Sequence, residues 1–325
     1  MRQQIVTDHC IKTIFSHDFV LYFLLLALVN YRIFEGIILN KHLLNIPIVY
    51  KYGTKWSAFL PALPLYLLGR YIADLSYLFC RSARTNVKKN LRLVFPDISQ
   101  KKLSFIAKNL FRNYSRYLID YCRFTNLNKR SILDQITYYE GKQNLELALQ
   151  MNKGLLLLTA HLGNWELGGI FFGSYGIKTN VLTLPDENPE IGNIRSWYRE
   201  IFNVKTITID KSPFSSIEMV KALSNNELIA MLIDRYDEKT DGIIVDFFKK
   251  PTQFPRGPLI LSRLTGAPIV VAFVVKEKNT YTGVIKGPFI VTHEKEEYET
   301  MKNIVNILEE YINMYPDQWY NFTQV

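Results

Sequence analysis

Hydrophobic runs of strand length recur along the second half of the chain, with predicted helices between them. The runs are residues 154–160, 180–184, 204–209, 227–233, 243–248 and 268–275, followed by a last one near 281–285. The predicted helices lie at 165–172, 191–202, 214–223, 258–264 and 294–314. Strands that are apolar throughout and separated by helices indicate a sheet that is covered on both faces. The pattern therefore predicts an α/β fold, with helices packed on both sides of the sheet.

Two more helices are predicted ahead of this region, at residues 83–95 and 99–124. In the second helix, apolar residues such as Leu103, Leu110 and Tyr121 recur at helical spacing, and lysines and arginines occupy the remaining face. We interpret it as an amphipathic helix with a solvated basic face.

The N-terminal part of the chain holds two charge-free apolar runs, residues 19–31 and 56–69. Each is shorter than the roughly 20 apolar residues that a helix needs to cross a bilayer. Pro61 and Pro64 would break or kink a straight helix, while Arg70 and Asp74 are spaced to pair on one helical face. We expect residues 55–80 to form a membrane-associated hairpin or in-plane helix, and residues 19–39 are a candidate span. The alternative is that both runs are buried core helices.

Positive charge is concentrated directly after these apolar runs. The chain has a net charge of +9, and residues 81–130 alone hold thirteen Lys or Arg against two Asp, which leaves −2 for the rest. This order suits the positive-inside pattern and predicts a cytoplasmic location for residue 81 onward, against an anionic membrane surface. No nucleic-acid-binding motif accompanies the basic block, so no nucleic-acid partner is expected. We therefore divide the chain into a membrane-associated region, residues 1–80, and an α/β domain, residues 81–325.

Composition and cysteine spacing exclude other classes of protein. Hydrophobic residues make up 48% of the chain and charged residues 21%, which is not the composition of a disordered chain. The three cysteines are scattered without metal-ligand spacing, so neither a disulfide framework nor a metal site is predicted. No cleavable signal peptide is evident at the N-terminus.

The segment with the clearest chemistry is Thr-Ala-His-Leu-Gly-Asn-Trp-Glu-Leu-Gly-Gly, residues 159–169. His161 follows an apolar run, at the end of a predicted strand where open α/β sheets bind their ligands. If Gly163 allows the backbone to fold back, the carboxylate of Glu166 can reach an imidazole nitrogen of His161. The carboxylate would then hold one tautomer, and the other nitrogen would be free to accept a proton.

This segment resembles the HX4E motif of the bacterial lipid A biosynthesis acyltransferases, the lauroyl and myristoyl transferases of the lysophospholipid acyltransferase superfamily. Three further blocks resemble the same family in the same order, and they are Arg84 to Pro96, Asp234 to Pro268, and Pro316-Asp317-Gln318-Trp319. The resemblance covers roughly residues 56 to 322. It implies a sheet like that of glycerol-3-phosphate acyltransferases, covered by helices and preceded by an N-terminal membrane-associated helical region.

The activity implied by the resemblance is transfer of a fatty acyl chain from a carrier thioester to a hydroxyl of a lipid A precursor or a related glycolipid. His161 would be the general base and Glu166 would orient it. The donor substrate would be a thioester of acyl-carrier protein or coenzyme A, and no cofactor would be needed. The expected partners are acyl-carrier protein and the membrane lipid acceptor. The enzyme would act at the cytoplasmic face of the bacterial inner membrane.

Further substrate-binding residues follow from the same resemblance and from helix-terminus chemistry. The backbone N–H groups of Gly163 and Asn164 are the expected donors to the thioester oxyanion. The expected contacts for an acceptor phosphate or headgroup are Arg199, Arg195, Asp234, Arg235 and Arg256.

Three alternatives stay open. The acceptor could be another lysolipid or glycolipid. The chain could be a catalytically inactive membrane-anchored lipid-binding protein, or a soluble esterase, although no Gly-x-Ser-x-Gly nucleophile motif is present.

Overall fold

The computed structural model describes residues 60–185, 188–209, 214–235 and 241–324, together with Gly53, Thr54 and Ser57. The candidate span at residues 19–39 lies outside the described residues, as does most of the N-terminal extension, so the predictions made for them are not tested.

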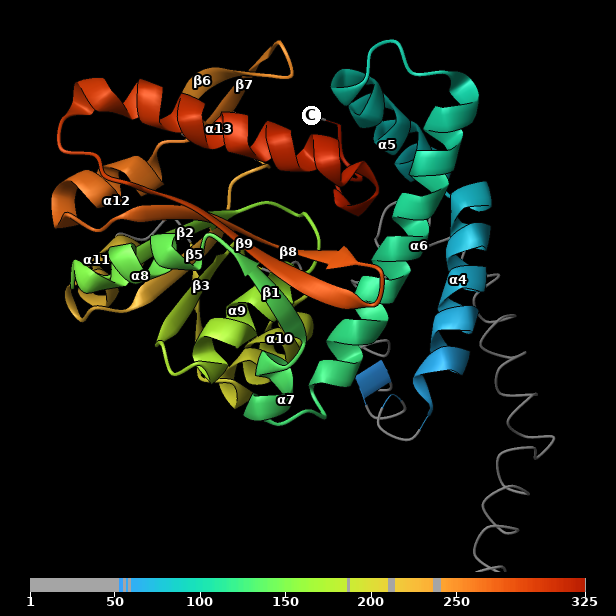
Figure 1. The fold of residues 1–325 in the computed structure, drawn as a ribbon, viewed down its shortest axis with the longest axis horizontal. Helices are drawn as coiled ribbons and strands as arrows, with labels where there is room; N and C mark the ends of the chain where they lie inside the picture. Colours follow the sequence, from blue (N-terminus) through green and yellow to red (C-terminus); the bar gives the residue numbers. More distant parts are fainter. Residues whose placement is uncertain are drawn as a thin grey trace, which may run out of the picture. The chain divides into compact units, whose positions relative to one another are not determined.

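The predicted helices and strands of the described chain are present in the predicted order, and the structure adds helices at 129–133 and 142–150 and strands at 136–140 and 250–255 (Figure 1). The helices are α4 (Ala62–Phe79), α5 (Arg81–Val94), α6 (Gln100–Phe124), α7 (Lys129–Leu133), α8 (Lys142–Gln150), α9 (Trp165–Ser174), α10 (Pro189–Ile201), α11 (Phe214–Ser224), α12 (Gly257–Thr265) and α13 (Glu297–Met314), with short 3-10 turns η2 (Glu294–Glu296) and η3 (Pro316–Gln318). The strands are β1 (Ile136–Glu140), β2 (Leu155–Thr159), β3 (Thr179–Thr183), β4 (Val204–Thr208), β5 (Leu228–Leu232), β6 (Gly242–Phe247), β7 (Lys250–Pro255), β8 (Ile269–Glu277) and β9 (Thr280–Phe289).

A seven-stranded sheet organises the fold, with the strand order β1-β9-β8-β2-β5-β3-β4. Neighbouring strands are parallel except at the β8–β9 hairpin, where the chain turns back on itself. The central strands β2 and β5 pair in register from Leu155 with Leu228 to Thr159 with Leu232. Their carboxyl ends therefore meet at the same edge of the sheet.

Both faces of the sheet are covered, as expected for strands without exposed alternate positions. Along β2, Leu156 and Leu158 face a core that includes Leu259 of α12 and Leu308 of α13. Residues of β2 on the alternate positions, such as Leu157, face helices α8 and α9 instead. The predicted two-sided covering of the sheet is confirmed.

One predicted strand lies outside the main sheet. Residues 243–248 correspond to β6, which pairs antiparallel with β7 in a separate two-stranded sheet. Its burial alternates between exposed and buried positions at its C-terminal end, as in a strand with one solvated face.

Helices α4, α5 and α6 pack beside the sheet, and α6 lies next to the β8–β9 hairpin (Figure 1). Pro61 is the N-cap of α4 and Pro64 lies in its first turn, where proline is tolerated, so the helix runs unbroken to Phe79. Asp74 of α4 does not pair with Arg70; it accepts two hydrogen bonds from Arg112 of α6, at 2.6 and 2.8 Å. The segment 62–79 is thus joined to the α/β domain, although the sequence-based division placed it in a separate region.

Among the described residues, no helix combines the length and the apolar character that crossing a bilayer requires.

Candidate active site

His161 and Asp234 form a hydrogen-bonded pair at the carboxyl ends of β2 and β5. The Nδ1 atom of His161 lies 2.8 Å from Oδ1 of Asp234, and the amide of His161 donates to Oδ2 of the same carboxylate at 3.1 Å. His161 comes two residues after the end of β2, and Asp234 comes two residues after the end of β5. The two strands are neighbours in the sheet, and this brings the two side chains together.

The Asp234 carboxylate fixes the tautomer of the imidazole. A carboxylate only accepts hydrogen bonds, so Nδ1 of His161 must carry the hydrogen. The Nε2 atom is then unprotonated in the neutral ring and can accept a proton. The arrangement has the geometry of an oriented general base.

Asp234 is held ionised by its surroundings. Its side chain is fully buried, and Trp319 donates its indole N–H to Oδ2 at 3.0 Å. Burial alone would raise the pKa of this carboxyl, but the charge and hydrogen bond of His161, the charge of Arg235 and the Trp319 hydrogen bond outweigh it and lower the pKa to about 2. Trp319 belongs to the block Pro316-Asp317-Gln318-Trp319 that was identified from the sequence, and in the structure it contacts the Asp234 side of the pair.

The partner of His161 corrects the sequence-based pairing. Glu166 does not hydrogen bond His161; its two carboxylate oxygens accept from Arg199, at 2.6 Å from Nη2 and 3.2 Å from Nε. Glu166 lies in the first turn of α9 and Arg199 in the last turn of α10, and both are buried. Only four residues lie between His161 and Glu166, and helix α9 begins at the last of them, Trp165, so that Glu166 points towards α10.

The buried pair of Glu166 and Arg199 keeps both groups charged. Burial would raise the pKa of Glu166, but Arg199 outweighs it and holds the pKa below its ordinary value, with smaller contributions from Arg195 and His161. Burial likewise opposes the charge on Arg199, yet Glu166 raises the pKa of the guanidinium. A third contact, from Nη1 of Arg199 to the hydroxyl of Thr206, ties the pair to β4.

The backbone N–H groups of Gly163 and Asn164 are occupied, which corrects their assignment as oxyanion donors. The Gly163 amide donates to Gln318 O at 3.0 Å, and the Asn164 amide donates to Val274 O at 2.7 Å. Gly163 has a φ of +66°, and a Cβ there would meet the Val274 carbonyl oxygen at 2.1 Å, so the turn requires glycine. Asn164 instead caps α9, because its side chain accepts from the Leu167 amide at 2.9 Å.

An apolar cavity of about 350 Å³ lies near the His161–Asp234 pair, between the sheet and helices α8 and α9. Its walls come mainly from side chains such as Leu157, Phe171, Val181 and Ile285, and Glu166 and Arg199 supply its polar part. Trp165 lines the same cavity and contacts the His161 ring edge to face, with ring centroids 5.1 Å apart. The cavity is therefore separated from the base by one indole ring.

The remaining predicted arginines have different surroundings. Arg195 lies one turn before Arg199 on α10, close enough for its charge to lower the pKa of Glu166. Arg235 follows Asp234 directly and donates to the backbone oxygen of Tyr320 at 2.6 Å.

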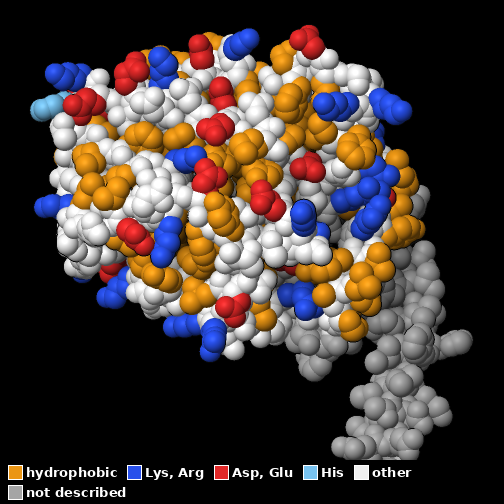
Figure 2. All heavy atoms as spheres, in the orientation of Figure 1, with side chains coloured by type: hydrophobic (Ala, Val, Ile, Leu, Met, Phe, Trp, Pro, Cys, Tyr) orange, Lys and Arg blue, Asp and Glu red, His pale blue; other side chains and the backbone are white. Residues whose placement is uncertain are grey.

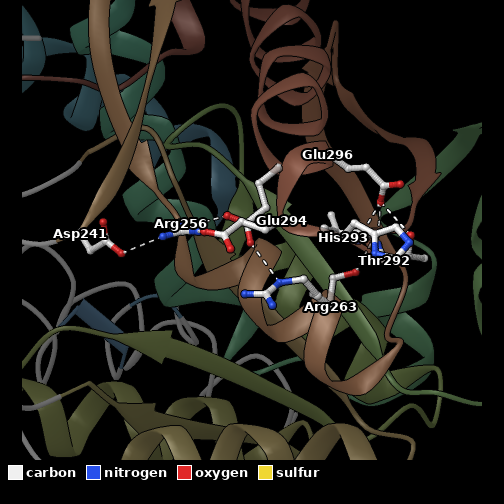
Figure 3. Close-up of polar contacts among 10 residues, drawn as sticks. Asp241, Arg256, Arg263, Thr292, His293, Glu294 and Glu296 are labelled. Carbon is white, nitrogen blue, oxygen red and sulfur yellow. Dashed lines mark hydrogen bonds and ion pairs between the residues drawn. The ribbon is translucent and has the colours of Figure 1, made fainter.

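Arg256 lies at the start of α12 in a cluster of ion pairs (Figure 3). Its guanidinium contacts Glu297 at 2.5 Å, Asp241 at 3.6 Å and also Glu294, and Arg263 shares Glu297 at 3.2 Å. Three carboxylates thus surround Arg256, which ties α12 to the start of α13. Its predicted contact with substrate has no support in this arrangement.

Among the described residues, no group of three or more His, Cys, Asp or Glu side chains is placed to hold a metal ion.

The chain is also similar to proteins of known function. Residues 45–324 match the model of a family described as bacterial lipid A biosynthesis acyltransferase. The lipid A biosynthesis lauroyltransferase of Escherichia coli is 26% identical over 273 residues, which are 82% of this chain and 87% of that protein. The palmitoleoyltransferase of lipid A biosynthesis from the same organism is 26% identical over 272 residues, 80% of this chain and 84% of that protein.

A phosphatidylinositol mannoside acyltransferase of Mycobacterium tuberculosis is also similar, at 29% identity over 164 residues. That match covers 49% of this chain and spans only about half, 50%, of the mycobacterial protein. Because the family model matches most of the sequence, the chain belongs to the bacterial lipid A biosynthesis acyltransferase family.

Proposed function

We propose that this protein transfers a fatty acyl chain from a carrier thioester to a hydroxyl of a lipid A precursor or a related glycolipid. The observation that carries the proposal is the His161–Asp234 pair beside an apolar cavity, in a chain of this family. The pair supplies a base for the hydroxyl, and the cavity supplies an apolar site for the acyl chain.

The reaction follows from the tautomer of His161. Its Nε2 atom accepts the proton of the acceptor hydroxyl while that oxygen attacks the thioester carbonyl carbon. The tetrahedral intermediate then collapses, the carbon–sulfur bond breaks, and the imidazolium returns the proton to the departing thiolate. Asp234 stabilises the imidazolium between the two steps, and no covalent bond to the enzyme is formed.

The N-terminus of α9 is the source of positive potential for the oxyanion. The first amides of a helix have no acceptor within the helix, and the helix dipole adds partial positive charge at the same end. Helix α9 begins at Trp165, four residues after His161, so this end of the helix lies beside the base. The amides of Trp165 and Glu166 are the donors we assign, in place of those of Gly163 and Asn164.

The apolar cavity would hold the acyl chain during transfer. Its wall of aliphatic and aromatic side chains suits a hydrocarbon, and the ion pair of Glu166 with Arg199 closes one part of it with a polar surface. The pair positions α9 and α10 around the cavity, which is the role we assign to Glu166.

The similar proteins, and not the geometry of the site, indicate which lipid is the acceptor. Two relatives are named for lipid A biosynthesis and match over four fifths of this chain, so a lipid A precursor is the first candidate. A second candidate is a mannosylated phosphoinositide, because a relative at 29% identity is named for that acceptor. The donor would be an acyl-carrier protein or coenzyme A thioester, and neither needs a cofactor.

The surface of α4 supports action at a membrane. Leu63, Leu67 and Tyr71 are each about 60% exposed or more and recur every four residues, which places them on one helical face. Figure 2 shows hydrophobic side chains gathered along the edge of the molecule where Figure 1 places α4, next to lysines and arginines. An apolar helical face beside basic residues is typical of helices that lie in the interface of an anionic membrane. We infer a location at the cytoplasmic face of the inner membrane.

Acyl transfer is tested by incubating the full-length protein with a lauroyl or palmitoyl thioester of acyl-carrier protein or coenzyme A. A lipid A precursor and a phosphatidylinositol mannoside are offered as acceptors, and the products are identified by mass spectrometry. We expect one acylated acceptor with the wild type and none with His161→Ala. Near wild-type transfer by His161→Ala would overturn the role of the base.

Membrane association is tested by flotation with vesicles of phosphatidylcholine, with and without phosphatidylglycerol. We expect Leu67→Glu and Tyr71→Glu to weaken binding to the anionic vesicles, whereas Leu264→Glu, at an exposed leucine of α12, leaves it unchanged. Binding that is equally strong for all variants and unaffected by salt would contradict this location.

A further inference from the structure

A second, polar cavity of about 230 Å³ lies next to the loop between β2 and α9, the loop that carries His161. It is enclosed by α6, the β8–β9 hairpin, residues 163–164 of the loop and residues 317–320 near the C-terminus. The mechanism described above uses none of the charged side chains in this cavity. Its lining is mostly polar, in contrast to the apolar cavity beside α9.

Three cationic side chains line this cavity. Arg116 comes from α6, and Lys276 and Lys278 come from the β8–β9 hairpin, whereas Asp317 is the one carboxylate among the described lining residues. Burial raises the pKa of Asp317, so its carboxyl is protonated more easily than an ordinary one. The cavity therefore has an excess of positive charge.

Lys276 is only partly neutralised. Its Nζ atom contacts Oδ2 of Asp120 at 2.8 Å and lies 3.4 Å from the hydroxyl of Tyr281. Asp120 also accepts hydrogen bonds from Tyr281 and Tyr66, so its charge is shared among three donors. An ammonium group has three N–H donors, which leaves Lys276 with capacity for a ligand.

The contacts of Arg116 differ from those of Arg112 and Arg84, two other arginines of the basic block at residues 81–130. Arg112 is paired with Asp74, and Arg84 donates to carbonyl oxygens at the end of α4. Within the described residues, by contrast, Arg116 has no carboxylate partner, and its contacts are a 3.4 Å approach to Asn279 and the face of the Tyr66 ring. Its Nε atom is buried and has no hydrogen-bond partner. A buried donor without an acceptor is unfavourable, and a bound water, ion or ligand oxygen can satisfy it.

An aromatic wall joins this cavity to the active site. Tyr117 and Tyr320 line the cavity, and Trp165, which contacts the His161 ring, stacks on Tyr117 with centroids 4.5 Å apart. Tyr320 is also joined to the base directly, because its amide donates to the backbone oxygen of His161 at 2.7 Å. The rings of Tyr117 and Trp165 therefore connect a group bound in the cavity to the His161 ring.

We propose that this cavity binds a phosphate group of a substrate, held by Arg116, Lys276 and Lys278. Phosphate suits the site because its oxygens accept several hydrogen bonds at once and a guanidinium matches their spacing. The inference rests on the proposed acyl transfer only for the source of the phosphate group. That source is either a phosphate on the acceptor headgroup or the phosphate of the donor's phosphopantetheine arm.

Direct binding of inorganic phosphate tests the site without any acyl transfer. The full-length protein is titrated in detergent, and binding is followed by broadening of the phosphorus NMR signal. We expect Arg116→Gln to weaken binding at least tenfold, Arg116→Lys to recover part of the loss, and Asp317→Asn to strengthen binding because it removes a carboxylate from the cavity. Thermal unfolding of each variant shows that the fold is retained.

The matched control is Lys295→Gln, which removes one positive charge at the far end of α13. Lys295 is exposed, and the 18 residues of α13 separate it from the cavity by about 27 Å. We expect its phosphate affinity to equal that of the wild type. Absence of phosphate binding by the wild type, or equal binding by Arg116→Gln and the wild type, would overturn the proposal.

Kinetics then identify the source of the phosphate. If Arg116→Gln raises KM for the acceptor, and the increase disappears with a dephosphorylated acceptor, the site binds the headgroup. If it raises KM for the thioester donor instead, the site binds the phosphopantetheine phosphate. If the wild type binds phosphate but transfers no acyl chain to any acceptor, the proposed function fails while the phosphate site stands.

Discussion

The Nδ1 atom of His161 and the Oδ1 atom of Asp234 lie 2.8 Å apart, although 73 positions separate the two residues in the chain. Their contact depends on the pairing of β2 with β5, two strands that are far apart in sequence. The carboxylate also accepts the indole N–H of Trp319, from the last few residues of the described chain. Three distant segments therefore converge on one buried carboxylate, which is the orientation that the proposed general base needs.

Replacing Asp234 by Asn is expected to lower kcat by about 100-fold or more. An amide can present its NH2 group to Nδ1, which favours the other tautomer and places the hydrogen on Nε2, and it no longer stabilises the imidazolium. The measurement is the steady-state rate of acyl transfer with saturating donor and acceptor.

The control is Asp246→Asn, an exposed carboxylate on β6, which should retain the wild-type rate. If Asp234→Asn kept the wild-type kcat while Glu166→Gln lost it, the partner expected from the sequence would be the functional one after all.

The sequence predicted the central strands well because they carry a simple signal. The run at 154–160 is uninterrupted and apolar, and β2 occupies Leu155–Thr159 with every residue buried. Strand β1 was not predicted, because Ile136–Glu140 is an edge strand with exposed positions and a charged residue at its C-terminal end.

The candidate site was only partly predictable, since spacing along the chain does not give the order of strands in a sheet. His161 was found from its motif, but Asp234 was expected only as a contact for the acceptor, because nothing in the sequence shows that β5 lies beside β2. Glu166 was assigned to His161 because it is near in sequence, whereas its partner Arg199 lies 33 positions away on another helix. Local spacing was thus a poor guide where tertiary contacts decide the partner.

Glu166→Gln is expected to lower the free energy of unfolding by about 3 kcal/mol, because it leaves the buried Arg199 guanidinium without its counter-charge. Replacing both residues by Met should restore much of the loss, because no buried charge then remains. Urea unfolding in detergent, followed by tryptophan fluorescence, measures both effects.

An exposed ion pair serves as the comparison for this experiment. Lys302 and Glu299 lie 3.8 Å apart on α13 with roughly half or more of each side chain exposed, so Glu299→Gln should change stability by less than about 1 kcal/mol. A Glu166→Gln protein as stable as the wild type would contradict the structural role of the pair.

Stability should fall in acid through Asp234. The pKa of this carboxyl is lowered from the ordinary value of 3.8 to about 2 in the folded protein, so its contribution is present above pH 3.8 and is lost as the pH falls towards 2. The difference of nearly two pH units corresponds to about 2 kcal/mol. The wild type should have a higher free energy of unfolding in urea than Asp234→Asn at pH 5, and this difference should decrease by that amount between pH 5 and pH 2. Parallel pH profiles for the two proteins would rule this out.

Substitution of Gly169 is expected to shorten the acyl chain that the enzyme prefers. Gly169 lies in α9 and lines the apolar cavity, and a Cβ there would be 3.6 Å from Val181, which is an ordinary contact. Gly169→Ala should therefore fold normally with a small effect, whereas Gly169→Leu adds four carbon atoms to the cavity wall and should shift the preference by about two to four carbons. The measurement is competition among thioesters of different chain length, with products resolved by mass spectrometry. Gly257→Leu, at a glycine with open space around it at the start of α12, should leave the profile unchanged. If Gly169→Leu used the same chain lengths as the wild type, the acyl chain would have to bind elsewhere.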